Sequence, residues 1–141
     1  MENKNTTAAI TPDIKKQIIQ AQQNEVTEYY IYKRLARKSK NHKHKHILNS
    51  IAKDELRHYK IWIKYSGIEV EPNQWYLFKF YWLTQIFGIK YGLTRMEKGE
   101  NRAKINYIEI GKYIPEALKI SEEEIQHERD LFKILKRKQL K

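Results

Sequence analysis

Apolar residues recur every three or four positions along most of this chain, the spacing of one face of an α-helix. Residues 52–62 show the pattern clearly, because Ala52, Leu56, Tyr59 and Trp62 fall on one side of such a helix. No stretch of useful length alternates with the two-residue period of a strand. We therefore predict an all-α protein with four helices that form a bundle. They cover residues 11–39, 44–66, 73–110 and 115–137.

Prolines and glycines mark the ends of these predicted helices. Pro12 and Pro115 lie where the first turns of the first and last helices are expected, a position that tolerates proline. Gly67 and Gly111 are expected to end the second and third helices. The third helix contains three glycines at which it can bend: Gly88, Gly92 and Gly99.

The four predicted helices contain the same two-helix unit twice. In each unit the first helix carries a glutamate followed seven residues later by a tyrosine, and the second carries Glu-x-x-His. The first unit contains Glu25, Tyr32, Glu55 and His58, and the second contains Glu100, Tyr107, Glu124 and His127. This internal repeat predicts a four-helix bundle with approximate two-fold symmetry.

The repeated residues are suited to binding a pair of metal ions. Residues three apart lie on one helix face, so each Glu-x-x-His offers a carboxylate and an imidazole to the same point. Di-iron and di-manganese bundles have this ligand pattern: two helices each provide one glutamate, and the other two each provide Glu-x-x-His. One imidazole per metal among many oxygens suits two iron ions, or manganese, better than zinc. The predicted ligands are Glu25, Glu55, His58, Glu100, Glu124 and His127.

Two further glutamates lie one turn away from this set. Glu28 follows Glu25 by three residues, so we expect it to be a seventh ligand, or a carboxylate that moves on and off the metal during catalysis. Glu97 precedes Glu100 by three residues and either contributes to the site or lines its entrance.

Three other side chains beside the predicted ligands have two interpretations each. The hydroxyls of Tyr32 and Tyr107 can hydrogen-bond a ligand carboxylate of a neighbouring helix, or these residues are ordinary core tyrosines. Asp54 can orient a histidine or face solvent. The remaining histidines, His42, His44 and His46, alternate with lysines that repel cations, so we expect a solvated link outside the site.

Composition limits the other classes of protein. The chain has 141 residues and no cysteine, which excludes disulfides, cysteine-ligated zinc and an iron–sulfur or rubredoxin centre on these residues. Its net charge of +11 is explained by a lysine-rich solvated surface, and because no nucleic-acid-binding motif accompanies it, we expect no nucleic-acid partner. Residues 1–10 lack the pattern of a signal peptide, so we expect a flexible N-terminus and a cytoplasmic protein.

An aromatic segment, residues 75–93, approaches the length and apolarity of a transmembrane helix. Lys79, Gln85 and Lys90 interrupt it, whereas a spanning segment needs about 20 predominantly apolar residues. We expect it to pack in the core or to form a homodimer interface, with an exchange of helices between protomers as one form of that dimer. An interfacial contact with a membrane surface is the alternative.

Four segments that together cover nearly all of residues 14–136 resemble the ferritin-like superfamily, and within it the rubrerythrin family. They read NEVTEYYIYKRLA, ILNSIAKDELRHYKIWIKYSG, IFGIKYGLTRMEKGENRAKINY and IPEALKISEEEIQHERDLFKIL. The chain is most similar to the rubrerythrin-like domains that precede membrane iron or manganese transporters of the vacuolar iron transporter type. The resemblance implies a ferritin-like di-iron bundle over residues 11–138, with the six predicted ligands in the family's positions and Glu28 as its extra carboxylate.

The expected function follows from this site. We expect an oxidoreductase that reacts with hydrogen peroxide or dioxygen, as in a rubrerythrin-like peroxidase that counters oxidative stress. Because no rubredoxin-type cysteines are present, the electron donor must be external. Two alternatives stay open at this point. The same residues suit a ferroxidase or iron-binding protein that buffers or delivers iron, and a metal-free helical interaction module would use the basic surface instead.

Overall fold

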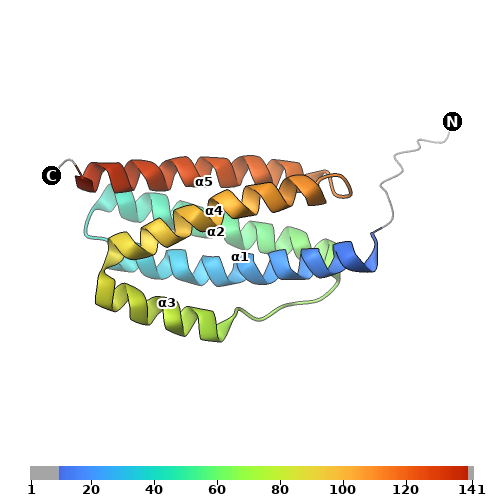
Figure 1. Cartoon of the computed structure of the whole chain (residues 1–141), viewed down its shortest axis with the longest axis horizontal. Helices are drawn as coiled ribbons and strands as arrows, with labels where there is room; N and C mark the ends of the chain where they lie inside the picture. Colours follow the sequence, from blue (N-terminus) through green and yellow to red (C-terminus); the bar gives the residue numbers. More distant parts are fainter. Residues whose placement is uncertain (1–9, 140–141) are drawn as a thin grey trace.

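The computed structural model describes residues 10–139, and side chains as far as residue 136. It contains five α-helices and, over these residues, no strand, which confirms the all-α prediction. They are α1 (Pro12–Lys38), α2 (His42–Ser66), α3 (Gln74–Phe87), α4 (Ile89–Ile110) and α5 (Glu116–Gln139). In Figure 1, α1, α2, α4 and α5 extend along the long axis, and the shorter α3 lies beneath one end of them. The predicted flexible N-terminus falls almost entirely on residues 1–9, outside the described part.

Local capping explains where the first two helices begin and end. The Thr11 hydroxyl accepts a hydrogen bond from the backbone N–H of Ile14 at 3.2 Å, which satisfies one of the free donors of the first turn of α1. At the end of α2, Gly67 takes a positive φ of 71°, a conformation that glycine adopts without steric cost. The sequence signals at these two ends therefore act as expected.

The prediction of one helix over residues 73–110 is wrong, because the chain divides this segment into α3 and α4. Gly88 has a φ of 89° and a ψ of 172°, which no helical residue can have, and it ends α3 and precedes α4. Figure 1 shows the chain reversing direction at this point, so that α3 folds back beside the end of α4. The bend expected within a continuous helix is instead a complete break.

The expectation of a solvated histidine-rich link is wrong in part, although the three histidines belong to neither group of metal-ligand candidates. The side chain of Asn41 accepts hydrogen bonds from the backbone N–H groups of Lys43 and His44, so α2 begins at His42. His44 is buried, whereas His42 and His46 stay exposed. The link between α1 and α2 is correspondingly reduced to residues 39–41.

The interior consists of two apolar clusters with a polar layer between them. One cluster contains residues of all five helices, among them Leu35, Leu48 and Phe80. The other includes Trp62 and Ile114. α1 packs mainly against α2, and α4 mainly against α5. None of the helices within residues 10–139 combines the length and apolarity needed to cross a bilayer.

Candidate metal centre

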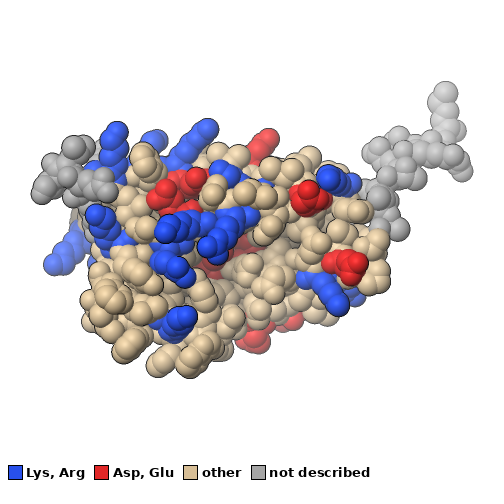
Figure 2. Space-filling model, viewed as in Figure 1, with Lys and Arg blue, Asp and Glu red and all other residues tan. Residues whose placement is uncertain are grey.

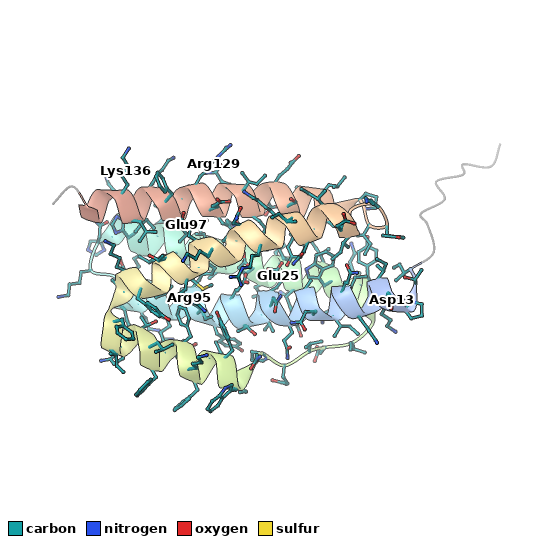
Figure 3. All side chains as sticks on the ribbon, in the orientation of Figure 1. Asp13, Glu25, Arg95, Glu97, Arg129 and Lys136 are labelled. Atoms are coloured by element: carbon teal, nitrogen blue, oxygen red, sulfur yellow. The ribbon has the colours of Figure 1, made fainter. Side chains whose placement is uncertain are left out.

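The polar layer contains the six residues that the sequence predicts as metal ligands. All six are at most 2% exposed, so four carboxyl groups and two imidazoles are removed from water together. Figure 3 shows one of them, Glu25, near the middle of the long helices. They are Glu25 on α1, Glu55 and His58 on α2, Glu100 on α4, and Glu124 and His127 on α5.

The donor atoms of these six residues form two overlapping groups of three glutamates and one histidine. Glu25 and His58 belong to one group, Glu100 and His127 belong to the other, and Glu55 and Glu124 belong to both. Within each group the ligand atoms lie within 4.8 Å of one another. This spacing suits a shared ion with metal–ligand bonds of about 2.0–2.4 Å, and two shared carboxylates are what a pair of bridged ions requires.

Each imidazole faces the carboxylates through its Nδ1 atom. His58 Nδ1 lies 3.1 Å from a carboxylate oxygen of Glu124 and 3.5 Å from one of Glu25. His127 Nδ1 lies 3.0 Å from an oxygen of Glu55 and 3.6 Å from one of Glu100. The two inward-facing nitrogens are therefore available to the two groups separately, one for each candidate ion.

The outward-facing Nε2 atoms contact a second pair of carboxylates. His127 Nε2 lies 2.9 Å from Asp54, and His58 Nε2 lies 3.1 Å from Glu123. When Nε2–H donates to such a carboxylate, Nδ1 keeps its lone pair directed inward, which is the tautomer that a metal ligand needs. The guanidinium of Arg57 contacts both Asp54 and Glu123 and offsets their negative charge. Asp54 therefore orients a histidine, one of the two roles considered for it.

Tyrosine hydroxyls hydrogen-bond the glutamates of α1 and α4 from the opposite helix. Tyr32 of α1 donates to Glu100 of α4 at 2.6 Å, and Tyr107 of α4 donates to Glu25 of α1 at 2.5 Å. Trp62 Nε1 also approaches Glu25, at 3.5 Å. These bonds hold one oxygen of each carboxylate, and the other oxygen of each, Oε2, has no hydrogen-bond partner.

The polar atoms left without partners fit a metal pair. Eight buried oxygens and nitrogens of the six residues have no hydrogen-bond partner, although a buried polar group without a partner normally costs about 1–3 kcal/mol. They are Glu25 Oε2, both oxygens of Glu55 and of Glu124, Glu100 Oε2, and Nδ1 of His58 and of His127. Divalent cations would satisfy these atoms and neutralise the four carboxylates, so the residues fit a two-ion site.

The proton affinities show how strongly the groups interact without metal. Burial and the charges of Glu25 and Glu100 hold the pKa of Glu55 well above its ordinary value of 4.5. Although burial opposes it, the closeness of Glu55 and the charge of His58 lower the pKa of Glu25 to about 2. The pKa of His127 rises to about 9, because its contacts with Asp54 and Glu100 outweigh the effect of burial. Metal ions entering the site must therefore displace protons.

Glu28 lies beside the six residues but in neither group of ligand atoms. It is half-buried and lines a cleft of about 450 Å³ between α1 and α4, to which Tyr76 of α3 and Arg95 and Arg102 of α4 also contribute. Its burial and the charge of Glu100 raise its pKa well above the ordinary value. Glu28 therefore occupies a position between solvent and the buried carboxylates.

Glu97 stays away from the ligand groups. Its side chain is half-buried, and its pKa is raised by burial and by the charge of Glu128 on α5. Neither group of ligand atoms includes it, and it does not line the cleft that contains Glu28. The position of Glu97 therefore supports neither of its predicted roles, as a contributor to the site or as a residue that lines its entrance.

Sequence reasoning missed two residues that act on the ligands through contacts between helices. Glu123 binds His58, and Trp62 approaches Glu25. Glu123 precedes the second Glu-x-x-His as Asp54 precedes the first, so comparison of the two repeats would have identified it. Trp62 follows Glu55 by seven residues, as Tyr32 follows Glu25, and this spacing was the available signal, although residue 131 in the second unit is leucine.

No family model matches this chain, and no curated protein and no solved structure is significantly similar to it.

Three consecutive glutamates of α5 allow the outer contact to be tested. Glu123→Gln keeps the size of the side chain but weakens its bond to His58 Nε2, so we expect about a 10- to 100-fold loss of Mn²⁺ affinity in calorimetric titrations. Glu122→Gln is the matched control, because Glu122 is exposed. Equal affinities of the two variants would contradict a positioning role for Glu123.

Proposed function

We propose that this chain is a ferritin-like, rubrerythrin-type di-iron protein, a four-helix bundle of two repeated helix pairs that reacts with hydrogen peroxide or dioxygen. The observation that carries the proposal is the pair of overlapping ligand groups with Glu55 and Glu124 in common. The reciprocal contacts of Tyr32 with Glu100 and of Tyr107 with Glu25 support the two-fold arrangement, because equivalent residues of the two units exchange equivalent bonds.

The chain's residues would hold two ferrous ions, one near His58 and one near His127. When bound, the pair would supply one electron from each ion, and these two electrons with two protons would reduce hydrogen peroxide to two water molecules. The protein keeps the carboxylates close together in a dry layer between two apolar clusters. An external donor must then return the two electrons.

The position of Glu28 supports a role in which its carboxylate changes contacts during turnover. It lines the cleft between α1 and α4, and Tyr107, which holds Glu25, lines the same cleft. Because Glu28 is half-buried and belongs to neither ligand group, it can approach the site from the cleft without first leaving another ligand position. We assign it the role of a mobile carboxylate, and assign the tyrosines the role of fixing Glu25 and Glu100.

The test combines metal content with reactivity. After anaerobic loading with Fe²⁺, we expect about two irons per chain by elemental analysis and rapid oxidation of both by a pulse of hydrogen peroxide. Glu55→Ala and Glu124→Ala should lose the iron and the reaction, because each removes a carboxylate shared by both groups. Glu122→Ala, which alters an exposed side chain of the same helix, should retain both.

The fate of the oxidised iron separates peroxidase from storage. A peroxidase keeps about two irons per chain over repeated cycles of reductant and peroxide, whereas a ferroxidase that stores iron accumulates ferric oxide. If wild-type protein and both alanine variants bind neither Fe²⁺ nor Mn²⁺, the metal assignment is wrong and a metal-free interaction module becomes the better explanation.

A further inference from the structure

One face of α3 is an exposed aromatic stripe. Trp75, Phe78 and Trp82 are 73%, 63% and 59% exposed, and Ile86 continues the stripe at 54%. These positions follow helical spacing and span about 17 Å at a rise of about 1.5 Å per residue. The opposite face of α3 is held by buried residues, among them Leu77 and Phe80, so the stripe is not needed for folding. Figure 3 shows side chains along α3 pointing away from the other helices.

Positive charge gathers at the same end of the molecule. Residues 29–53, 72–96 and 131–136 carry 13 of the 28 lysines and arginines and none of the 17 acidic residues. In the fold these residues form the second half of α1, the first half of α2, α3, the start of α4 and the last turns of α5. All of these parts lie at the same end of the molecule in Figure 1. On the face drawn in Figure 2, many of the lysines and arginines (blue) lie around this end, and the surface over α3 is largely uncharged (tan).

Basic residues also flank the stripe directly. The Arg34 guanidinium of α1 lies over the ring of Tyr81, 4.4 Å from its centre, and Lys38 Nζ hydrogen-bonds the Gln85 side chain at 2.5 Å. Lys79 is exposed within α3 itself. The stripe is thus an apolar surface bordered by cations, without an acidic residue on the helix.

We propose that α3 docks this protein on the surface of an anionic lipid bilayer. Tryptophan and phenylalanine side chains on one helix face bury themselves at the boundary between headgroups and acyl chains, and nearby lysines and arginines bind anionic headgroups. The 14 residues of α3 then lie in the plane of the interface, with the long helices outside the membrane.

The charges favour a bilayer over the two other occupants considered. A second copy joined through this face would bring two equally basic ends together, which is repulsive. Single-stranded nucleic acid would use the aromatic rings as stacking platforms, but the stripe also contains Ile86, which offers no ring to a base. A membrane interface accommodates aromatic and aliphatic side chains together with the cations around them.

The native tryptophans provide a direct readout. Trp75 and Trp82 are exposed in the stripe, whereas Trp62 is fully buried in the core. We expect vesicles of phosphatidylcholine with phosphatidylglycerol to shift the fluorescence of the full-length protein to shorter wavelength and to co-sediment it, and phosphatidylcholine vesicles to bind at least about tenfold more weakly. In Trp75→Phe/Trp82→Phe, vesicles should still bind but the fluorescence of Trp62 should not move.

Matched substitutions test the surface itself. Trp75→Ser/Phe78→Ser/Trp82→Ser should reduce vesicle affinity by roughly a hundredfold while leaving the circular dichroism unchanged, because these side chains are exposed. Ile105→Ser/Ile108→Ser removes comparably exposed apolar side chains of α4 outside the basic end, and it should bind vesicles as the wild type does. Added salt should weaken binding of the wild type.

Three results would overturn the proposal. One is vesicle binding that the triple α3 variant leaves unchanged. Another is a dimer in analytical ultracentrifugation that the same variant converts to monomer, together with no binding to vesicles, which would assign the stripe to a second copy. The third is α3-dependent binding of single-stranded oligonucleotides in place of vesicles. Each is independent of whether the candidate metal centre takes iron.

Discussion

Loading the metal-free protein with two equivalents of Fe²⁺ or Mn²⁺ under anaerobic conditions is expected to raise its Tm by about 10–20 °C. The eight buried atoms without hydrogen-bond partners gain ligand bonds only when ions are present. An ion at about 100 times its dissociation constant stabilises the folded state by about 2.7 kcal/mol, so two ions give about 5 kcal/mol. For a chain of 141 residues this corresponds to the stated shift, measurable by calorimetry or circular dichroism.

Magnesium at the same ionic strength is the control for general charge screening. Mg²⁺ holds its water molecules tightly and favours all-oxygen octahedral sites, so it should give a much smaller shift in a site with one imidazole for each ion. Equal stabilisation by Mg²⁺ and Mn²⁺ would mean that the ions act through the surface. An unchanged Tm with all of these ions would contradict a metal site in the buried layer.

Residues that depend on spacing along one helix were predictable from the sequence. Glu55 and His58 lie three positions apart, and this spacing alone places them on one face. The repetition of the same motif at Glu124 and His127 then identified the other half of the site. The structure brings these four residues and their partners on α1 and α4 into the two ligand groups.

Features that depend on backbone conformation or on contacts between helices were not predictable in the same way. The apolar pattern continues across Gly88, so only its positive φ shows that the chain stops one helix there and starts another. Residues 42–46 are polar and lysine-rich, which suggested a link, but the Asn41 cap starts α2 at His42, so these residues are helical. The contact of Glu123 with His58 joins residues 65 positions apart, so only comparison of the two repeats, and not spacing along one helix, points to it.

The position of Glu28 shows the limit of periodicity as a guide to ligands. Its spacing of three from Glu25 places it on nearly the same side of α1. The remaining angular offset is enough to direct it toward the cleft shared with α4, while Glu25 is held inward by Tyr107. The sequence therefore predicted that Glu28 lies beside the site, and the cleft is the space into which the proposed movement of its carboxylate would take it.

Replacing Glu55 by glutamine is expected to abolish the metal-induced rise in Tm while lowering the Tm of the metal-free protein by no more than about 3 °C. Glu55 is shared by both ligand groups, so an uncharged amide in its place should weaken the binding of both candidate ions. Without metal, burial and neighbouring charges raise the pKa of Glu55, so its protonated form is favoured, and glutamine resembles that form in shape and charge. Thermal unfolding with and without Mn²⁺ measures both effects.

A residue that only supports the fold would behave differently, because its replacement would lower the Tm by similar amounts with and without metal. Glu122→Gln is the matched control, since this exposed side chain should leave both values unchanged. The dependence on pH adds a second test. The folded metal-free protein binds the Glu55 proton more tightly than the unfolded chain does, so wild-type stability should fall as the pH rises above 4.5. Glu55→Gln lacks this proton and should show a smaller fall as the pH rises above 4.5.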